Sequence, residues 1–273
     1  MSELEKDLQH LSNVWKVKAW EGVVFYAARI FEREFLRYMK GQGTSKENLY
    51  SALAYEEDFC FFPRSFLYFG HALRRLGNIV RHSTSENISQ AEAQTAICLL
   101  VMLLRHLEAK REFSVLGNSF GLDFSAFSEL LQNDAFAVYE KLQETPLDIP
   151  YLQALWQRRG ENGIFDNLTQ IALYAEILIE QSTVKDDTWN HVRDVLKTAL
   201  ECQSFEQGHL RLYQLYAVLL RRQGNYDRAI EILEKCVGQI KDPETAGILA
   251  SAYRSRGLCS LTPESDLEKA LHL

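Results

Sequence analysis

Three polar side chains near residue 80 have the types and the spacing that phosphate chemistry needs. The segment HALRRLGNIVRHS places Arg75, Asn78 and His82 at positions i, i+3 and i+7, which lie one above another on a single helical face. A guanidinium can hold non-bridging oxygens and stabilise a pentavalent transition state. An imidazole can take a proton from an RNA 2′-hydroxyl or donate one to the leaving oxygen. These residues therefore predict a catalytic or binding site for RNA that needs no metal and no cofactor.

The same residues also fit a purely structural interpretation. Cations near the C-terminal end of a helix are stabilised by the helix dipole. Gly77 and Asn78 can serve close packing and the end of the helix. Both interpretations stay open at the level of the sequence.

Apolar periodicity predicts the helices that would position this face. Residues 15–39 carry an apolar stripe with a period of 3.6, and Ser89 with Glu92 three residues later has the form of a capping box. The pattern predicts helices over 15–39, 46–55, 65–81 and 90–111. Four helices in so short a stretch predict a four-helix bundle.

The second half of the chain carries a repeated pattern. Helices are predicted over 127–143, 151–159, 167–181 and 188–202. The stretch QGNYDRAIEILEKC then resembles a tetratricopeptide repeat, with Gly224 at the turn and Ala229 at a small position. Leu249 and Gly257 repeat the pattern of Tyr216 and Gly224 at a spacing of 33 residues. An α-solenoid of helix pairs is expected, with a concave surface for a protein or peptide partner.

The chain stops inside the last repeat with no polar capping helix, which suggests a fragment of a longer protein or a partner at that end. The predicted fold class is all-α. The predicted division is a bundle over residues 1–115, a helical connecting segment over 116–163, and repeats over 164–273.

Composition excludes several classes of protein. Residues 1–115 carry 15 basic and 14 acidic residues, and the remainder carries 15 and 23, so sequence-independent binding of nucleic acid by the second half is disfavoured. No apolar run approaches the length of a membrane span, and the first residues are unlike a secretory signal. Five scattered cysteines without metal-ligand spacing predict reduced thiols. These features predict a soluble cytoplasmic protein.

Residues 17–112 resemble the HEPN superfamily. The stretch RRLGNIVRH at the end of the third predicted helix is similar to the LGN-x-x-x-H element of its DUF4145 branch, and it follows a helix, YAARIFEREFLRYM, that is also similar. The resemblance implies a metal-independent endoribonuclease that acts as a homodimer, often in bacterial stress or phage defence. It implies that His82 is the acid or base, Arg75 the phosphate clamp and Asn78 the polar residue between them.

The sequence departs from that family in one place. Active members usually carry Arg directly before the polar residue, whereas Gly77 stands there in this chain. Branches without the tight motif only bind nucleotide or RNA. Glu32 lies where related bundles keep an acidic partner for the arginine, and an ordinary surface pair explains it equally well. The main alternative function is a non-catalytic repeat scaffold that mediates protein–protein interaction.

Overall fold

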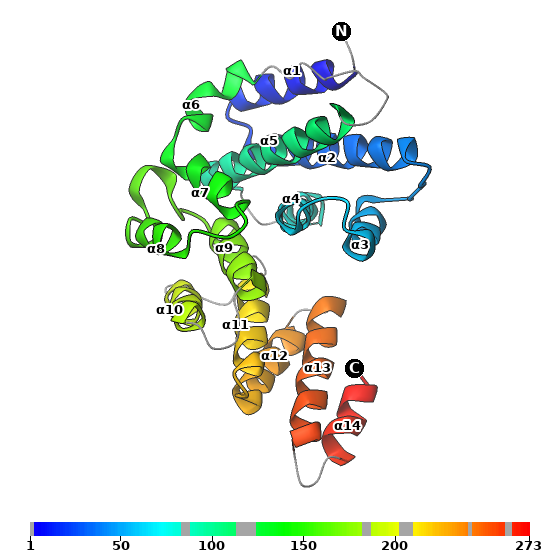
Figure 1. Ribbon diagram of the computed structural model, residues 1–273, viewed down its shortest axis with the longest axis vertical. Coiled ribbons are helices and arrows are strands. Elements are labelled where there is room, and N and C mark those ends of the chain that lie inside the picture. The colour runs from blue at the N-terminus through cyan, green and yellow to red at the C-terminus, as the bar shows by residue number, and fades with distance from the viewer. Residues whose placement is uncertain are drawn as a thin grey trace. The chain divides into compact units, whose positions relative to one another are not determined.

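A computed structural model describes residues 3–82, 88–112, 124–181, 187–201, 210–239, 242–259 and 264–273. Within these residues every regular element is a helix (Figure 1). The predicted all-α, solenoid-like fold class is therefore confirmed. The chain divides into two compact units, residues 1–173 and residues 174–273. The finer division at residues 115 and 163 remains a prediction.

The first unit is a helical bundle organised around one long helix, α2. Its main helices are α1 (Glu3–Lys16), α2 (Trp20–Gly41), α3 (Leu49–Phe59), α4 (Arg64–His82) and α5 (Gln90–Glu112). Helix α2 packs against all four of the others. It does so because apolar residues recur every three or four positions, and Ala27, Ile30, Phe31 and Phe35 are completely buried.

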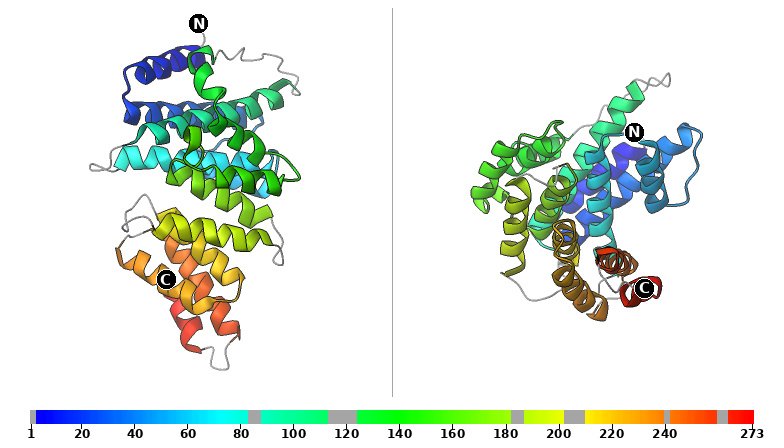
Figure 2. Two further views of the ribbon diagram at one scale, coloured as in Figure 1. Left: turned by 90° about the vertical axis from the view of Figure 1, so that its left-hand side faces the viewer. Right: turned by 60° about the horizontal axis from the view of Figure 1, so that its bottom comes forward.

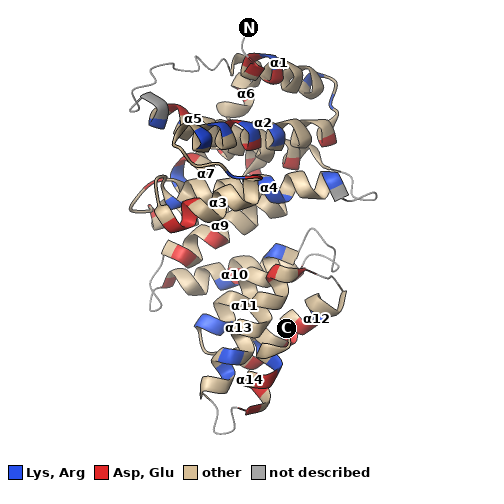
Figure 3. Cartoon of the chain, turned by 90° about the vertical axis from the view of Figure 1, so that its right-hand side faces the viewer, with Lys and Arg blue, Asp and Glu red and all other residues tan. Residues whose placement is uncertain are grey.

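The first helix, α1, was not predicted from the sequence. The chain breaks at Lys18, which has a φ of 58°, so α1 and α2 are separate helices where one helix was predicted from Trp15 onward. Acidic and basic residues occur in both α1 and α2 (Figure 3). Ion pairs to α2 hold it: Asp7 with Arg33, and Glu3 with Arg37 at 2.7 Å. The buried residues Leu4, Leu8 and Leu11 also recur at helical spacing, a local signal that sequence reasoning overlooked.

Several local signals were predicted correctly. The backbone N–H of Ser89 donates to Glu92 Oε2 at 2.8 Å, and the N–H of Glu92 donates to Ser89 Oγ at 3.2 Å. This capping box starts α5 as expected. The predicted helix over 127–143 is instead divided, because Asn133 caps a new helix, α7 (Asp134–Leu142). The remaining helices of this unit are α6 (Ser128–Leu131), α8 (Ile149–Gln157) and the start of α9 (Leu168–Gln181).

The four cysteines in the described residues, Cys60, Cys98, Cys236 and Cys259, are free thiols, as predicted. Cys202 lies outside the described residues.

The second unit continues α9 and adds consecutive helices that pack on their neighbours along the chain (Figure 2). They are α10 (Asp187–Glu201), α11 (Leu210–Arg222), α12 (Tyr226–Gln239), α13 (Pro243–Cys259) and α14 (Glu264–Leu271). Gly224 has a φ of 80°, the left-handed conformation that the predicted turn between α11 and α12 requires. Ala217 and Ala229 are completely buried, so small residues lie where the helices of the pair approach.

A charged cluster ties three helices of the second unit together. Arg211 on α11 contacts Glu176 on α9 and donates to Glu244 on α13 at 2.7 Å. Its guanidinium also donates to Gln214 Oε1 at 3.1 Å. Only 8% of the Glu176 side chain is exposed, so its ion pair with Arg211 is largely shielded from water.

Replacing Arg211 should therefore destabilise the second unit. We expect Arg211→Met to lower the free energy of unfolding by about 2–3 kcal/mol, because the buried carboxylate of Glu176 would lose the ion pair that Arg211 provides. Arg228→Met is the control: Arg228 pairs with Glu231 on an exposed face of α12, and its loss should cost about 0.5 kcal/mol or less. Urea unfolding of both variants checks this. Equal losses would show that the cluster contributes no more than a surface pair.

Candidate functional site

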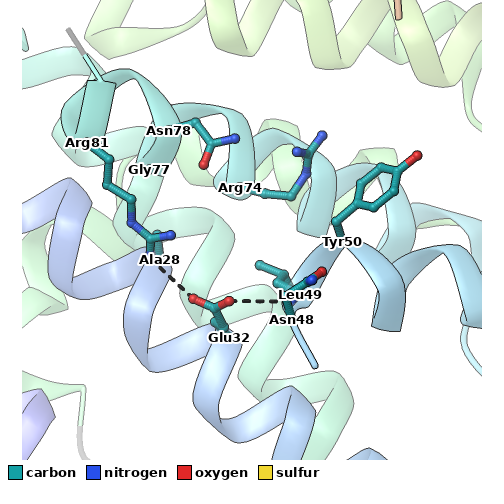
Figure 4. A pocket seen from close by; sticks show the side chains of 9 residues that line it. All are labelled: Ala28, Glu32, Asn48, Leu49, Tyr50, Arg74, Gly77, Asn78 and Arg81. Atoms are coloured by element: carbon teal, nitrogen blue, oxygen red, sulfur yellow. Dashed lines mark hydrogen bonds and ion pairs between the residues drawn. The ribbon is translucent and has the colours of Figure 1, made fainter. Parts of the chain in front are cut away.

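The first unit holds a cavity of about 290 Å³ between α2, α3 and α4. The close view in Figure 4 shows that polar side chains from three helices face it. Its lining residues are Ala28, Glu32, Asn48, Leu49, Tyr50, Arg74, Gly77, Asn78 and Arg81.

Close packing between α4 and α2 forms one wall of this cavity. A Cβ atom added at Gly77 would lie 2.7 Å from the Cβ of Ala28, a distance that real Cβ atoms do not adopt. Two turns earlier on α4, a Cβ at Gly70 would lie 2.8 Å from Leu53 Cδ2, the end of a side chain that can move aside more easily than the Cβ of Ala28. Glycines seven residues apart thus let α4 lie against its neighbours. This confirms the packing role that the sequence left open for Gly77.

Two arginines of α4 line the cavity, and they are held in different ways. Arg81 Nη2 donates to Glu32 Oε2 at 3.2 Å. The guanidinium of Arg74 lies over the ring of Tyr50, with 5.2 Å from Cζ to the ring centroid, a distance at which a cation is attracted to the aromatic face. The Nε atom of Arg74 is buried and has no hydrogen-bond partner among the described residues.

The N-terminus of α3 forms the opposite wall. Asn48 caps this helix, since the N–H of Ser51 donates to Asn48 Oδ1 at 2.9 Å. The N–H of Leu49 donates to Glu32 Oε1 at 3.3 Å. The first turn of a helix carries partial positive charge, so α3 adds to the positive potential of the two arginines.

The charges at the cavity favour an anion. Glu32 is the one acidic residue of the lining, and both of its oxygens already accept hydrogen bonds, from Arg81 and from Leu49. The lining therefore contains two guanidiniums, a helix N-terminus and the amide of Asn78. It contains one carboxylate, which is already hydrogen-bonded. Such a set can hold a phosphate or a carboxylate group.

The predicted site residues lie on two overlapping faces of α4. Asn78 lines the cavity, as Figure 4 shows. Arg75 is a partly buried residue of the same helix and is not part of the lining. His82 is the last residue of α4, and its side chain lies outside the described part of the structure. The joint site of Arg75, Asn78 and His82 stays a prediction.

Sequence reasoning did not single out Arg74 and Arg81. With 3.6 residues per turn, residues 74, 78 and 81 also share one helical face, so this spacing was the signal that could have identified them. Glu32 was weighed as a partner for an arginine, and the structure pairs it with Arg81 across two helices. No group of three or more metal-ligating side chains occurs among the described residues.

The second unit contains a larger groove between α12, α13 and α14. Its volume is about 610 Å³, and its lining residues are Glu234, Val237, Gly238, Leu249, Tyr253, Ser265, Glu268, Lys269, His272 and Leu273. Tyr253 forms the floor: its hydroxyl donates to Glu234, and Lys269 Nζ lies 5.3 Å from its ring centroid. Burial and the hydrogen bond to Glu234 raise the pKa of Tyr253 to about 12. The groove thus combines an apolar floor with a charged rim.

The helix pairs and their small residues define the second unit as a tetratricopeptide-like repeat unit. Residues 188–273 match the family model described as Tetratricopeptide Repeats-Sensor. Neither the curated proteins nor the solved structures contain a match to this chain. No helix in the described ranges is long and apolar enough to cross a membrane.

The packing of α4 on α2 gives a direct test of how the cavity is built. We expect Gly77→Ala to lower the free energy of unfolding by about 1–2 kcal/mol, because the new Cβ would overlap Ala28. This loss would occur although alanine favours a helix over glycine by about 1 kcal/mol.

Gly41→Ala is the matched control, since Gly41 is the last residue of α2 and a Cβ there meets nothing within 4 Å. Thermal unfolding should show no loss for this variant. A Gly77→Ala protein as stable as the Gly41→Ala protein would contradict the close contact.

Proposed function

We propose that this protein is an adaptor whose repeat unit binds a protein or peptide partner. The match of residues 188–273 to a repeat family is the observation that carries this proposal. Repeat units of helix pairs offer extended surfaces for binding rather than a reaction centre. The word sensor in the family's description agrees with a unit that responds to what it binds.

The groove of the second unit supports a peptide as the bound group. Its volume of about 610 Å³ falls within the range of about 300–1,000 Å³ typical of ligand pockets. Val237, Leu249 and Tyr253 supply apolar contact area, and Glu268 and Lys269 lie at the rim. A helical or extended peptide with apolar residues flanked by charges fits such a surface.

The groove can be tested once a partner has been recovered from the source cells and purified. Ser265 is an exposed residue of the groove on α14, so Ser265→Trp should fill the space and weaken binding by about tenfold or more. Its neighbour Glu264 is exposed but does not line the groove, and Glu264→Trp should bind with wild-type affinity. Isothermal titration measures both.

Two results would count against this function. Equal affinity of the two tryptophan variants would exclude the groove as the binding surface. Unchanged binding after removal of residues 188–273, which match the repeat family, would exclude the repeats altogether.

A second function is proposed for the first unit, as a metal-independent endoribonuclease or RNA-binding effector. The position of Asn78 at a cavity lined by Arg74 and Arg81 supports the RNA-binding part of this proposal, whereas Arg75 does not line that cavity. His82 would take the proton of an RNA 2′-hydroxyl while Arg75 holds the non-bridging oxygens. The 2′-oxygen would bond to phosphorus as the bond to the 5′-oxygen breaks, with the proton passing to that leaving oxygen. A homodimer in the cytoplasm, serving stress or phage defence, belongs to this proposal.

Cleavage of single-stranded RNA in EDTA tests the second function. The wild-type protein should yield 2′,3′-cyclic phosphate ends, and His82→Ala should lower the rate by about 100-fold or more. His71→Ala is the control. His71 lies on the same helix and is hydrogen-bonded to Glu57, with 3.0 Å between Nε2 and Oε1. Activity that survives in His82→Ala, or a wild-type protein that cleaves no RNA, would end the catalytic proposal.

A further inference from the structure

We propose that one face of α11 and α13 binds an acidic segment of a protein partner through Arg221 and Arg254. The inference rests on the proposed role of the repeat unit in binding a protein. It adds a second contact surface, because the groove between α12, α13 and α14 is lined by neither arginine. The chemistry of the face selects a segment that carries carboxylates beside an apolar side chain.

The two arginines occupy equivalent positions in successive helix pairs. Arg221 on α11 and Arg254 on α13 are 33 residues apart, which is the spacing of the repeat. Arg221 Nη1 donates a hydrogen bond to the hydroxyl of Ser251 on α13. Ser251 and Arg254 are three residues apart in the same helix, so their side chains are neighbours on its surface. Ser251 therefore brings the two guanidiniums within reach of one ligand.

Neither arginine forms an ion pair within the part of the chain that the structure describes. Arg221 is half-buried and bonds the neutral hydroxyl of Ser251 there. Burial and the neighbouring cation of Arg222 lower the pKa of Arg221. Arg254 is exposed. An anion bound at this face would offset both the burial of Arg221 and its repulsion by Arg222.

The carboxylates near this face are already paired with other cations. Glu244, which lies on the same face of α13, contacts Arg211 at 2.7 Å. Asp227 contacts Arg256 at 2.6 Å. The two unpaired arginines therefore make the face positive, although the whole chain carries a net charge of −7. Complementary charge favours an acidic partner.

The face also offers open space and an apolar contact. Gly247 on α13 is exposed, and a Cβ atom built there meets nothing within 4 Å. Leu258 is 71% exposed and follows Arg254 by one turn. Residues 247, 251, 254 and 258 are spaced by three or four, so they form one stripe along the helix. A peptide with a carboxylate next to an apolar side chain can thus contact Arg254 and Leu258 together.

Isothermal titration of the intact chain with two peptides tests this face. The probes are acetyl-EELEEL-amide and acetyl-QQLQQL-amide, in which glutamine replaces each carboxylate. We expect the acidic peptide to bind saturably and the glutamine peptide to bind at least about tenfold more weakly. Arg254→Gln and Arg221→Gln should each weaken binding of the acidic peptide by about fivefold or more. Raising the salt concentration from about 0.05 M to about 0.5 M should weaken it as well.

Two matched controls separate this face from other surfaces of the repeat unit. Arg228→Gln removes the same charge from α12, where Arg228 pairs with Glu231, and should keep the wild-type affinity. Gly247→Leu should obstruct the stripe and weaken the acidic peptide by about fivefold or more. Gly238→Leu adds the same side chain at an equally open glycine that lines the other groove, and should bind normally. The unfolding temperature of every variant is measured first.

Several outcomes would overturn the proposal. It fails if the acidic peptide does not bind, or if Arg228→Gln and Arg254→Gln lose affinity equally. Loss of binding in Gly238→Leu but not in Gly247→Leu would place the peptide in the other groove. Oligouridylate that binds more tightly than the acidic peptide and depends on Arg254 would show that the face binds phosphates. A dimer that sediments as a monomer after Arg254→Gln would show that a second copy covers the face.

Failure here is distinct from failure of the proposed function. These titrations use defined peptides and substitutions on α11 and α13. The proposed function is tested with a natural partner, with Ser265→Trp in the other groove and with removal of the repeats. A natural partner can therefore bind the repeats while the acidic peptide does not bind, and the reverse can also be observed.

Discussion

The contact between Gly77 of α4 and Ala28 of α2 determines the geometry of the first unit. It brings the two helices so close that a Cβ atom at residue 77 would overlap the Cβ of Ala28. Residues 74, 78 and 81 then face α2 and the start of α3, where Glu32 bridges Arg81 and the Leu49 amide. A wider separation of α2 and α4 would move the guanidiniums of Arg74 and Arg81 away from α2 and from the start of α3. The cavity, its positive potential and the position of Asn78 all follow from this helix packing.

Close packing of helices also shapes the second unit, where buried alanines and an ion-pair cluster take the place of glycine. Completely buried alanines allow α11 and α12 to approach, and Arg211 links α9, α11 and α13 through two carboxylates. Each helix pair therefore stabilises its neighbours, as expected when stability is shared between adjacent repeats. The groove beside Tyr253 is formed by three such helices, so a ligand bound there would contact two successive pairs at once.

The sequence predicted what depends on local chemistry. The capping box of Ser89 and Glu92 and the turn at Gly224 were found because each needs only a few neighbouring residues. Helix α1 was missed although the buried residues Leu4, Leu8 and Leu11 recur at helical spacing. Asn78 belongs to two faces of α4, one with Arg75 and the other with Arg74 and Arg81. Sequence reasoning followed the first face, so it identified Asn78 and missed Arg74 and Arg81. Only the contact of Gly77 with Ala28, which is not local, decides which face lines the cavity.

A double-mutant cycle on Gly77 and Ala28 measures the central contact most directly. The free energy of unfolding would be determined for the wild type, Gly77→Ala, Ala28→Gly and the double variant. If the two Cβ positions compete for one space, Ala28→Gly should offset much of the loss caused by Gly77→Ala, with a coupling free energy of about 1 kcal/mol or more. Losses that add within about 0.3 kcal/mol would contradict the contact on which the account of the site rests.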